Sequence, residues 1–336
     1  MPSLVEAASG LGNKIGRHFS ISGLLPGLFL TLWVYLLLAS GAPEHHPDLA
    51  RLGHAFRSLT GLAWLLSIAL VAGLLLHPLQ FSLTQFLEGY WGSGKLGVAA
   101  AAARSIHHRD RRRRLNRRMS TAEAELRNAS QDLAARNALL NDKVNGDALL
   151  HYYIRSQEAR RERRAYPDAM YRTMPTTLGN VLRRYEDAAG SNFGLDAIQV
   201  APYLATVAPP DQLEYLSGAR EEMDTAISLS VSALLATVIT AVLLLLDQEW
   251  LLLALLPYAV AYVSYRGAVS AAREYGTALS VVVTLGRFDL YESLHLPIPD
   301  NLAEERRRNK DLAHLLGGPA HLDASEIRYR HPNTQR

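Results

Sequence analysis

The chain lacks cysteine altogether among its 336 residues. This absence excludes a disulfide framework and every metal site that needs a thiolate ligand. The sequence also lacks the GxSxG motif of serine hydrolases and the HExxH motif of zinc proteases. Because we find no other catalytic signature, we assign no catalytic residue and expect no enzyme activity, no cofactor and no bound metal ion.

Charged side chains are missing from four long apolar segments. They are residues 21–41, 59–77, 226–246 and 250–265. A helix needs about 20 apolar residues to cross the hydrocarbon core of a bilayer, so the sequence predicts four transmembrane helices in two pairs. Only Asp247, Gln248 and Glu249 separate the last two segments, which indicates an antiparallel hairpin.

The first apolar segment has a second interpretation, as a cleaved signal peptide. Lys14 and Arg17 precede it and the small residues 39–42 follow it, as in secretory signals. Its apolar core is long for such a signal, and a second apolar segment follows closely. These two features favour a retained transmembrane helix.

Lysine and arginine are scarce in the segments that we expect outside the cytoplasm. With the N-terminus inside, these segments are residues 42–58 and 247–249, which hold only Arg51 and Arg57 of the 35 basic residues. Cytoplasmic loops of membrane proteins are enriched in basic residues. We therefore expect both termini of a multi-pass protein to lie in the cytoplasm.

This topology divides the chain into five parts. The expected class is all-α, with a mainly helical cytoplasmic domain inserted between two transmembrane pairs. The parts are a cytoplasmic N-terminus (1–20), the first transmembrane pair (21–79), the cytoplasmic helical domain (80–225), the second transmembrane hairpin (226–266), and a cytoplasmic C-terminal helix with a loose tail (267–336).

Small side chains recur every four residues in the third apolar segment. They form one weakly polar stripe, made of Ser228, Ser232, Ala236 and Thr240. The first segment has Gly23 and Gly27 at the same spacing, and the second has Ala69 and Gly73. Small residues let membrane helices approach closely, so we interpret these stripes as packing faces within the chain. Contact faces of an oligomer, or a pore lined by the hydroxyl groups, are the alternatives.

Arginine is concentrated in one stretch of the predicted cytoplasmic domain. The residues are Arg104, Arg109, Arg111, Arg112, Arg113, Arg114, Arg117 and Arg118. Anionic lipid headgroups attract such clusters, by about 1 kcal/mol for each basic residue near the surface. Nucleic acid is the other common partner, but no aromatic side chain alternates with these arginines to stack on bases. We therefore expect contact with lipid or with a protein partner.

Residues 81–96 hold two features that lead into the arginine stretch. The aromatic and apolar residues 81–91 have helical spacing, typical of an interfacial helix or of a continued second span. Residues 89–96 (GYWGSGKL) nearly match a phosphate-binding loop, but Leu96 replaces the hydroxyl residue that holds magnesium and no strand pattern precedes it. We interpret Gly89, Gly92 and Gly94 as a flexible joint in the backbone.

Two charged helices are predicted after the arginine stretch. Ser120 and Glu123 form a capping box that should open the first of them, and Gly146 should end or kink it. The second should cover residues 147–164, with Leu149, Leu150, Tyr153 and Ile154 on its apolar side. Its basic cluster at residues 160–164 is interpreted as a solvated face, or alternatively as a lipid or partner site.

Local signals also predict the elements between residues 166 and 225. Residues 174–177 (MPTT) should form a turn and cap a helix that Gly190 stops, and Pro202 should close the next short element. Residues 209–211 (PPD) should open a helix that continues into the third apolar segment, since proline is tolerated in a first helical turn.

The sequence of this region resembles a group of uncharacterised bacterial membrane proteins, notably from actinobacteria. The resemblance lies in residues 174–182 (MPTTLGNVL), 186–187 (ED), 194–196 (GLD), Pro202 and 287–291 (RFDLY). It covers roughly the last two thirds of the chain and implies a bacterial inner membrane. The group has no established activity, so the resemblance implies no catalytic residue.

Two functions fit these features. The first is an integral membrane scaffold or signalling component whose basic cytoplasmic helices contact anionic lipid and a protein partner or a second copy of the chain. The alternative is an oligomeric channel or membrane-perturbing effector, such as one belonging to a bacterial defence system. An enzyme is a third and weaker interpretation.

Overall fold

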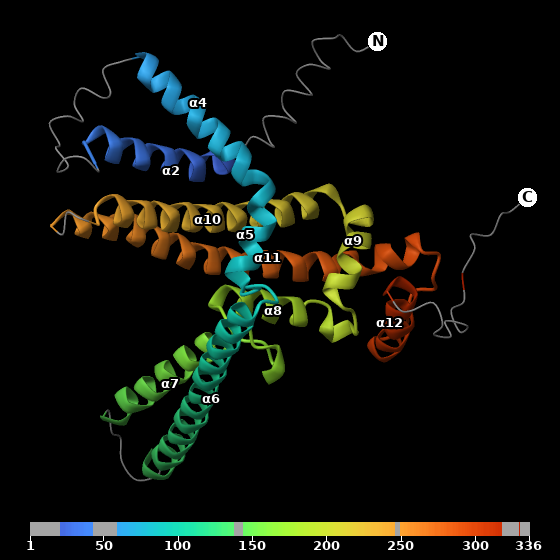
Figure 1. Ribbon diagram of the computed structural model, residues 1–336. Coiled ribbons are helices and arrows are strands. Elements are labelled where there is room, and N and C mark those ends of the chain that lie inside the picture. The colour runs from blue at the N-terminus through green and yellow to red at the C-terminus, as the bar shows by residue number, and fades with distance from the viewer. Residues whose placement is uncertain (1–20, 43–58, 138–143, 246–248, 318–328, 330–336) are drawn as a thin grey trace, which may run out of the picture. The chain divides into compact units, whose positions relative to one another are not determined.

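The computed structural model describes residues 21–42, 59–137, 144–245, 249–317 and 329 (Figure 1). The chain is all-helical, with 85% helix and no strand within those ranges, which confirms the predicted class. Contacts divide the chain into two units. The first unit comprises Met1–Phe86 and Tyr215–Tyr275, and the second comprises Leu87–Glu214 and Gly276–Arg336.

The first unit contains a closely packed pair of apolar helices. α2 (Ile21–Ala39) packs against α4 (Leu59–Leu76). A Cβ atom added to Gly27 of α2 would lie 2.6 Å from the backbone nitrogen of Gly73 and 3.1 Å from the carbonyl oxygen of Ala69. A larger residue at position 27 would force the two helices apart, so the predicted packing of these small residues within the chain is confirmed.

Two long helices contribute most of their length, within Tyr215–Tyr275, to the first unit. They are α10 (Pro210–Leu243) and α11 (Leu255–Ser293), the latter preceded by the 3-10 helix η4 (Trp250–Ala254). Ser230 Oγ donates a hydrogen bond to the carbonyl oxygen of Ala261 at 3.0 Å, and Trp33 Nε1 donates to Thr240 Oγ1 at 2.9 Å. These bonds join α10 to α11 and to α2 among apolar side chains.

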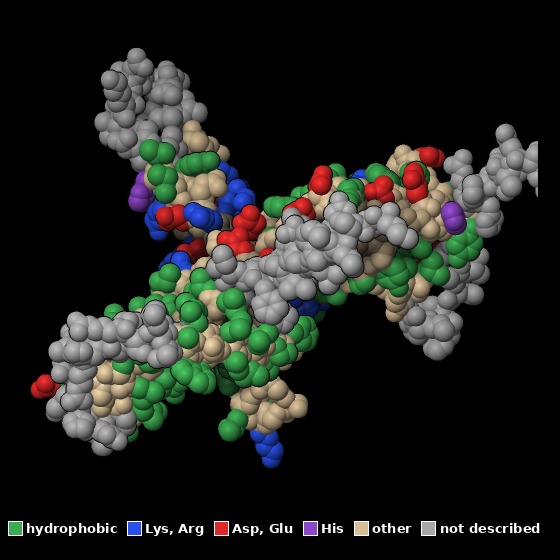
Figure 2. All heavy atoms as spheres, turned by 90° about the horizontal axis from the view of Figure 1, so that it is seen from above, with side chains coloured by type: hydrophobic (Ala, Val, Ile, Leu, Met, Phe, Trp, Pro, Cys, Tyr) green, Lys and Arg blue, Asp and Glu red, His purple; other side chains and the backbone are tan. Residues whose placement is uncertain are grey.

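Within the described ranges, two helical segments are long and apolar enough to cross a membrane, Pro210–Leu243 and Trp250–Ser293. The bent pair Ala63–Leu75 and Gln80–Glu88 would make a third if counted as one span, and the apolar stretch Leu24–Ala39 of α2 is shorter. Large apolar side chains such as Leu252 (70% exposed) lie on the surface. Figure 2 shows hydrophobic side chains that cover part of the surface with few charged groups among them. Length and composition thus indicate membrane association, and the predicted total of four spans stays a prediction.

α5 (Gln80–Glu88) is a helix of its own rather than a straight continuation of α4. The 3-10 helix η1 (His77–Leu79) separates the two, and the chain bends by 64° there. Pro78 explains the break, because proline cannot donate the backbone hydrogen bond of a continuing helix. The predicted glycine joint follows, with Gly89 and Gly92 at φ angles of 110° and 83°.

α6 (Lys95–Asn137) runs through the arginine stretch and beyond it without a break. The predicted helix start at Ser120 is wrong, because the Ser120 hydroxyl donates to the carbonyl of Arg117 at 2.9 Å, inside the helix. Serine can satisfy its hydroxyl on the preceding turn in this way when strong helix formers surround it. α7 (Val144–Arg163) begins before Gly146, and residues 138–143 lie outside the described part.

α8 (Thr177–Ala188) begins and ends as the sequence predicts. Thr176 Oγ1 accepts a hydrogen bond from the backbone nitrogen of Gly179 at 3.0 Å, which caps the helix. Gly190 adopts a φ of 77°, a left-handed conformation that favours glycine and stops the helix. The 3-10 helices η2 (Met170–Arg172) and η3 (Ser191–Phe193) flank α8.

α9 (Ala197–Val207) contradicts the predicted end at Pro202, which lies inside the helix. Buried residues on both sides of the proline, Val200 and Leu204, hold the helix together by packing. Tertiary packing here outweighs the hydrogen bond that proline removes.

Two helix starts in the C-terminal half follow capping chemistry. α10 begins at Pro210 as predicted and continues into the third apolar segment. α12 (Leu302–Gly317) was not predicted by itself. Asn301 Oδ1 accepts from the backbone nitrogen of Glu304 at 3.0 Å, and the Glu304 carboxylate accepts from that of Asp300 at 3.1 Å. The spacing Asn-x-x-Glu is the signal that would have located this helix.

Candidate anion-binding site

α6 and α7 of the second unit form an antiparallel helical hairpin (Figure 1). Buried residues at intervals of three, four or seven, the spacing of one helical face, make its narrow seam. They are His108, Arg112, Leu115 and Ala122 on α6 and Ser156 and Ala159 on α7. Small and polar side chains thus occupy positions that leucine usually fills, so the seam contains ionisable groups away from water.

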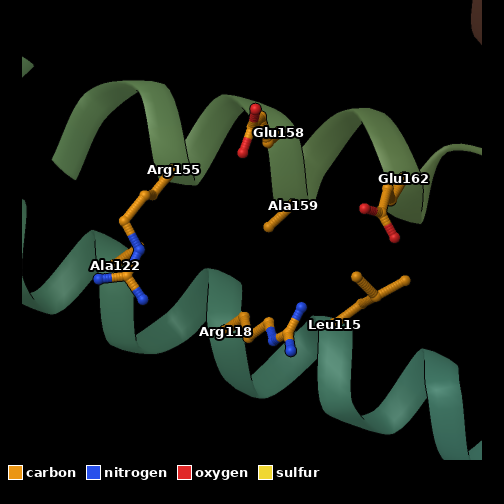
Figure 3. A pocket seen from close by; sticks show the side chains of 7 residues that line it. All are labelled: Leu115, Arg118, Ala122, Arg155, Glu158, Ala159 and Glu162. Carbon is orange, nitrogen blue, oxygen red and sulfur yellow. The ribbon is translucent and has the colours of Figure 1, made fainter. Parts of the chain in front are cut away.

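A small cavity of about 190 Å³ opens along this seam (Figure 3). Leu115, Arg118 and Ala122 line it from α6, and Arg155, Glu158, Ala159 and Glu162 line it from α7. Figure 3 shows Arg155 extending from α7 toward Ala122. The lining contains two arginines and two glutamates, so the cavity has no excess of either charge.

His108 lies near the end of the seam, where its Nδ1 is 3.1 Å from the hydroxyl of Tyr166. Its Nε2 makes no hydrogen bond with any described residue. Burial, followed by the neighbouring charges of Arg104, His107 and Arg111, lowers the pKa of His108 to about 4. The imidazole is therefore neutral at neutral pH and adds no positive charge to the hairpin.

Arg112 is buried beside Asp168, with only 4% of the residue exposed. Its Nη2 donates to the backbone carbonyl of Asp168. Its Nε and Nη1 are buried and make no hydrogen bond with the described residues. Burial lowers the pKa of Arg112, the charge of Arg163 lowers it further, and Asp168 opposes the shift. Arg112 is thus a buried cation with spare donors, and its burial does not fit the lipid or partner contact predicted for it from the sequence.

The other arginines of the predicted cluster lie nearer the surface. Arg109 is half-buried, and six are exposed: Arg104, Arg111, Arg113, Arg114, Arg117 and Arg118. Arg111 pairs with Glu162 at 3.3 Å and Arg113 with Asp110 at 3.5 Å. Such exposed pairs contribute little stability. The remaining exposed arginines of the cluster form no ion pair with a described residue, so their charge is available to an outside anion.

A second and larger hollow, of about 430 Å³, lies where α6, α7 and the residues near α8 meet. We call it the arginine groove. Its lining comprises Asn116, Met119 and Glu123 of α6, Arg160 and Arg163 of α7, and Arg164, Asp168 and Arg184. Four arginines and two acidic residues give the groove an excess of positive charge.

One carboxylate organises the arginine groove. Asp168 receives Arg163 at 3.3 Å and Arg184 at 3.0 Å, on different oxygens. Its side chain is 71% exposed, whereas those of Arg163 and Arg184 are 17% and 28% exposed. Arg163 is held further by Asn116 Oδ1 at 3.0 Å and by the carbonyl of Tyr166 at 3.0 Å. Two guanidinium groups are therefore fixed by the fold and share one exposed carboxylate.

The predicted stripe of α10 lies in the interior of the first unit. Ser228, Ser232, Ala236 and Thr240 are each at most 2% exposed. Thr240 accepts from Trp33 and donates to the carbonyl of Ala236 at 2.7 Å. The hydroxyls of Ser228 and Ser232 are buried without a hydrogen bond to the described residues. In one chain the stripe is thus enclosed by protein.

Residues 174–180 act as a structural clamp. Asn180 is fully buried and makes three hydrogen bonds, to the nitrogen and carbonyl of Met174 and to the carbonyl of Thr176. The Thr176 hydroxyl donates to the carbonyl of Glu88 at 2.9 Å. A Cβ on Gly179 would lie 2.1 Å from that same carbonyl. These residues therefore hold the end of α5 against the start of α8. This structural role accounts for the sequence of residues 174–180 without a catalytic or binding role.

Residues 287–291 serve a similar structural purpose near α12. Arg287 Nε donates to Glu305 Oε1 at 2.8 Å, and its guanidinium lies 4.2 Å and 4.1 Å from the ring centres of Phe193 and Phe288. Tyr291 donates to Asn309 Oδ1 at 2.7 Å. This network fixes α12 to α11 and η3 within the second unit.

The sequence shows the basic cluster at residues 160–164, but it does not indicate that this cluster lies beside Asp168 and Arg184. No local pattern could have done so, because the groove forms only when three helical segments pack together. Among the described residues, no group of three or more His, Asp or Glu side chains is placed to hold a metal ion.

Comparisons with protein-family models, with curated proteins and with solved structures found no match. The resemblance of residues 174–202 and 287–291 to bacterial membrane proteins therefore stays a prediction.

Proposed function

We propose that this chain is an integral protein of a bacterial inner membrane, with four spans and both termini in the cytoplasm. Its α6–α7 hairpin binds anionic lipid headgroups and positions the second unit for a protein partner, so the chain acts as a scaffold or signalling component. The observation that supports this most strongly is a set of exposed arginines on α6 that form no ion pair with any described residue.

Electrostatics favours lipid as the surface that these arginines meet. Arg104, Arg114, Arg117 and Arg118 form no ion pair within the described part of the chain, and the sequence places them shortly after an apolar helix pair. An anionic leaflet attracts each such side chain by about 1 kcal/mol, and the attraction acts within a Debye length of the surface. Several together give useful affinity without a shaped pocket.

A protein partner is supported by apolar side chains that the hairpin does not use. Leu150, Tyr153 and Ile154 of α7 are 55%, 51% and 49% exposed. Their spacing in the sequence predicts that they lie on the apolar side of this helix, yet the α7 residues buried in the seam are Ser156 and Ala159. A partner, or a second copy of the chain, would remove this apolar area from water.

The channel alternative gains no support from the hydroxyl stripe. Ser232 and Thr240 are 1% and 0% exposed within one chain. A pore lined by these hydroxyls would require α10 to turn its packed face outward.

Neutralising two exposed arginines should weaken the contact of α6 with anionic lipid. We expect Arg114→Gln with Arg117→Gln to reduce the attraction by about 2 kcal/mol, roughly thirtyfold. Because the chain has no cysteine, Ser120→Cys provides a single site for a polarity-sensitive dye. The full chain in nanodiscs of phosphatidylcholine with increasing phosphatidylglycerol should show a blue shift, and the variant should need more phosphatidylglycerol to reach it.

The matched control removes the same charge from α12, by Arg307→Gln with Lys310→Gln, both exposed. We expect this control to respond like the parent chain. An equal response from the parent and both variants, or a shift independent of phosphatidylglycerol, would refute lipid binding by α6.

A further inference from the structure

We propose that the arginine groove is a binding site for a phosphate group, carried either by a small soluble molecule or by a lipid headgroup. This inference is independent of the α6 contact proposed above, because Arg114 and Arg117 do not line the groove. It concerns a shaped site with fixed donors instead of a charged surface.

The donors of the groove are already held in place. Arg163 is oriented by Asn116 Oδ1 and by the carbonyl of Tyr166, both at 3.0 Å. Arg184 is oriented by Asp168 at 3.0 Å. Fixing a guanidinium before the ligand arrives removes much of the entropic cost of binding. Guanidinium groups also match the oxygens of phosphate in pairs, which explains their frequent use in phosphate sites.

The charge of the groove is left unbalanced by the chain itself. Glu123 neutralises Arg160 at 2.7 Å. Asp168 is the shared ion-pair partner of both Arg163 and Arg184. The exposed Arg164 forms no ion pair with the described residues. A phosphate with two negative charges would balance the arginines that one carboxylate leaves unsatisfied.

A buried cation beside the groove strengthens this conclusion. Only 4% of Arg112 is exposed to solvent, and its guanidinium donates a hydrogen bond to the backbone carbonyl of Asp168. Its Nε and Nη1 make no hydrogen bond in the described part of the chain. An unpaired buried charge is costly, and its field adds to the attraction of an anion near Asp168.

Asp168 gives the proposal a distinctive signature. Its carboxylate is the group with which an incoming phosphate competes, since it is the most exposed member of its ion-pair network. Removing its charge should therefore tighten phosphate binding. If these residues were only structural, Asp168→Asn would loosen the region and would not increase the affinity for any anion.

The test titrates inorganic pyrophosphate into the full chain in a neutral detergent and measures heat. We expect saturable binding, weakened at least about tenfold by Arg184→Gln and strengthened roughly tenfold by Asp168→Asn. Arg164→Gln should also weaken binding, and because Arg164 is exposed this variant keeps the test valid if Arg184→Gln fails to fold. Arg307→Gln with Lys310→Gln, an exposed pair on α12 outside the groove lining, should bind pyrophosphate like the parent.

A second arm distinguishes the source of the phosphate. The chain is first placed in nanodiscs of phosphatidylcholine that contain phosphatidylglycerol or a phosphorylated phosphatidylinositol. It is then transferred into detergent, and the lipid that it retains is measured by native mass spectrometry. Retention lost in Arg164→Gln, without pyrophosphate binding, assigns the site to a headgroup. Pyrophosphate binding with the variant pattern above assigns it to a soluble phosphate. If neither ligand binds, or if binding ignores Arg164, Arg184 and Asp168, the proposal is overturned.

Discussion

Replacing Arg287 with methionine is expected to lower the free energy of unfolding of the second unit by about 3–5 kcal/mol. The substitution leaves the Glu305 carboxylate, in a residue only 4% exposed, without its partner at 2.8 Å. It also removes the guanidinium that lies between Phe193 and Phe288. Hydrogen exchange of the α12 amides in the full chain, measured in detergent by mass spectrometry, should show the loss as faster exchange.

The double variant Arg287→Met with Glu305→Leu provides the control. Replacing both members of a buried pair by apolar residues of similar size costs less than removing one, so we expect the double variant to exchange more slowly than Arg287→Met. If the two variants exchanged equally fast, the pair itself would not be what holds α12 in place.

Replacing Asn180 with leucine should destabilise the second unit by at least about 3 kcal/mol. Leucine has a similar size, but it cannot replace the three hydrogen bonds to Met174 and Thr176. Buried backbone groups would then lack partners, and the turn before α8 would lose its fixed shape. Thermal unfolding of the full chain in detergent should show a midpoint lower by several degrees.

Asn192→Ala is the matched control for this substitution, because Asn192 is exposed. We expect it to unfold at the temperature of the parent chain. A normal midpoint for Asn180→Leu would mean that the clamp at residues 174–180 contributes little, contrary to its burial and hydrogen bonding.

Backbone chemistry accounts for the parts of the fold that were predictable. Thr176, Gly190 and Pro210 mark helix ends because each acts on its own turn, through a cap, a left-handed φ or a fixed φ. The glycine contact between α2 and α4 was predictable for a related reason, since small residues at a four-residue spacing lie on one face.

Competition between local signals and longer context accounts for the errors. Ser120 and Glu123 satisfy a capping pattern, yet they lie inside a helix of 43 residues rich in good helix formers. Pro202 should end a helix, yet packed residues before and after it keep α9 intact. The spacing of residues in the sequence does not show whether a local cap or proline outweighs the helix propensity and packing around it.

The arginine groove could be predicted only in part. Clustering in the sequence revealed the basic residues of α6 and of residues 160–164. The burial of Arg112, and the meeting of Arg163 and Arg184 at Asp168, depend on how α6, α7 and α8 pack. The apolar side chains of α7 illustrate the same limit, because periodicity located Leu150 and Ile154 on one side without showing which side packs.

We propose above all that the arginine-rich helix α6 lies on the cytoplasmic side of a membrane that the chain crosses several times. Single-cysteine variants test it directly in intact cells with a membrane-impermeant maleimide. Ser120→Cys lies on α6, and Ala50→Cys lies in the predicted outer segment, outside the described residues. We expect labelling of Ala50→Cys in intact cells and of Ser120→Cys only after the membrane is opened; labelling of Ser120→Cys in intact cells, or recovery of the chain in the aqueous phase without detergent, would contradict the account.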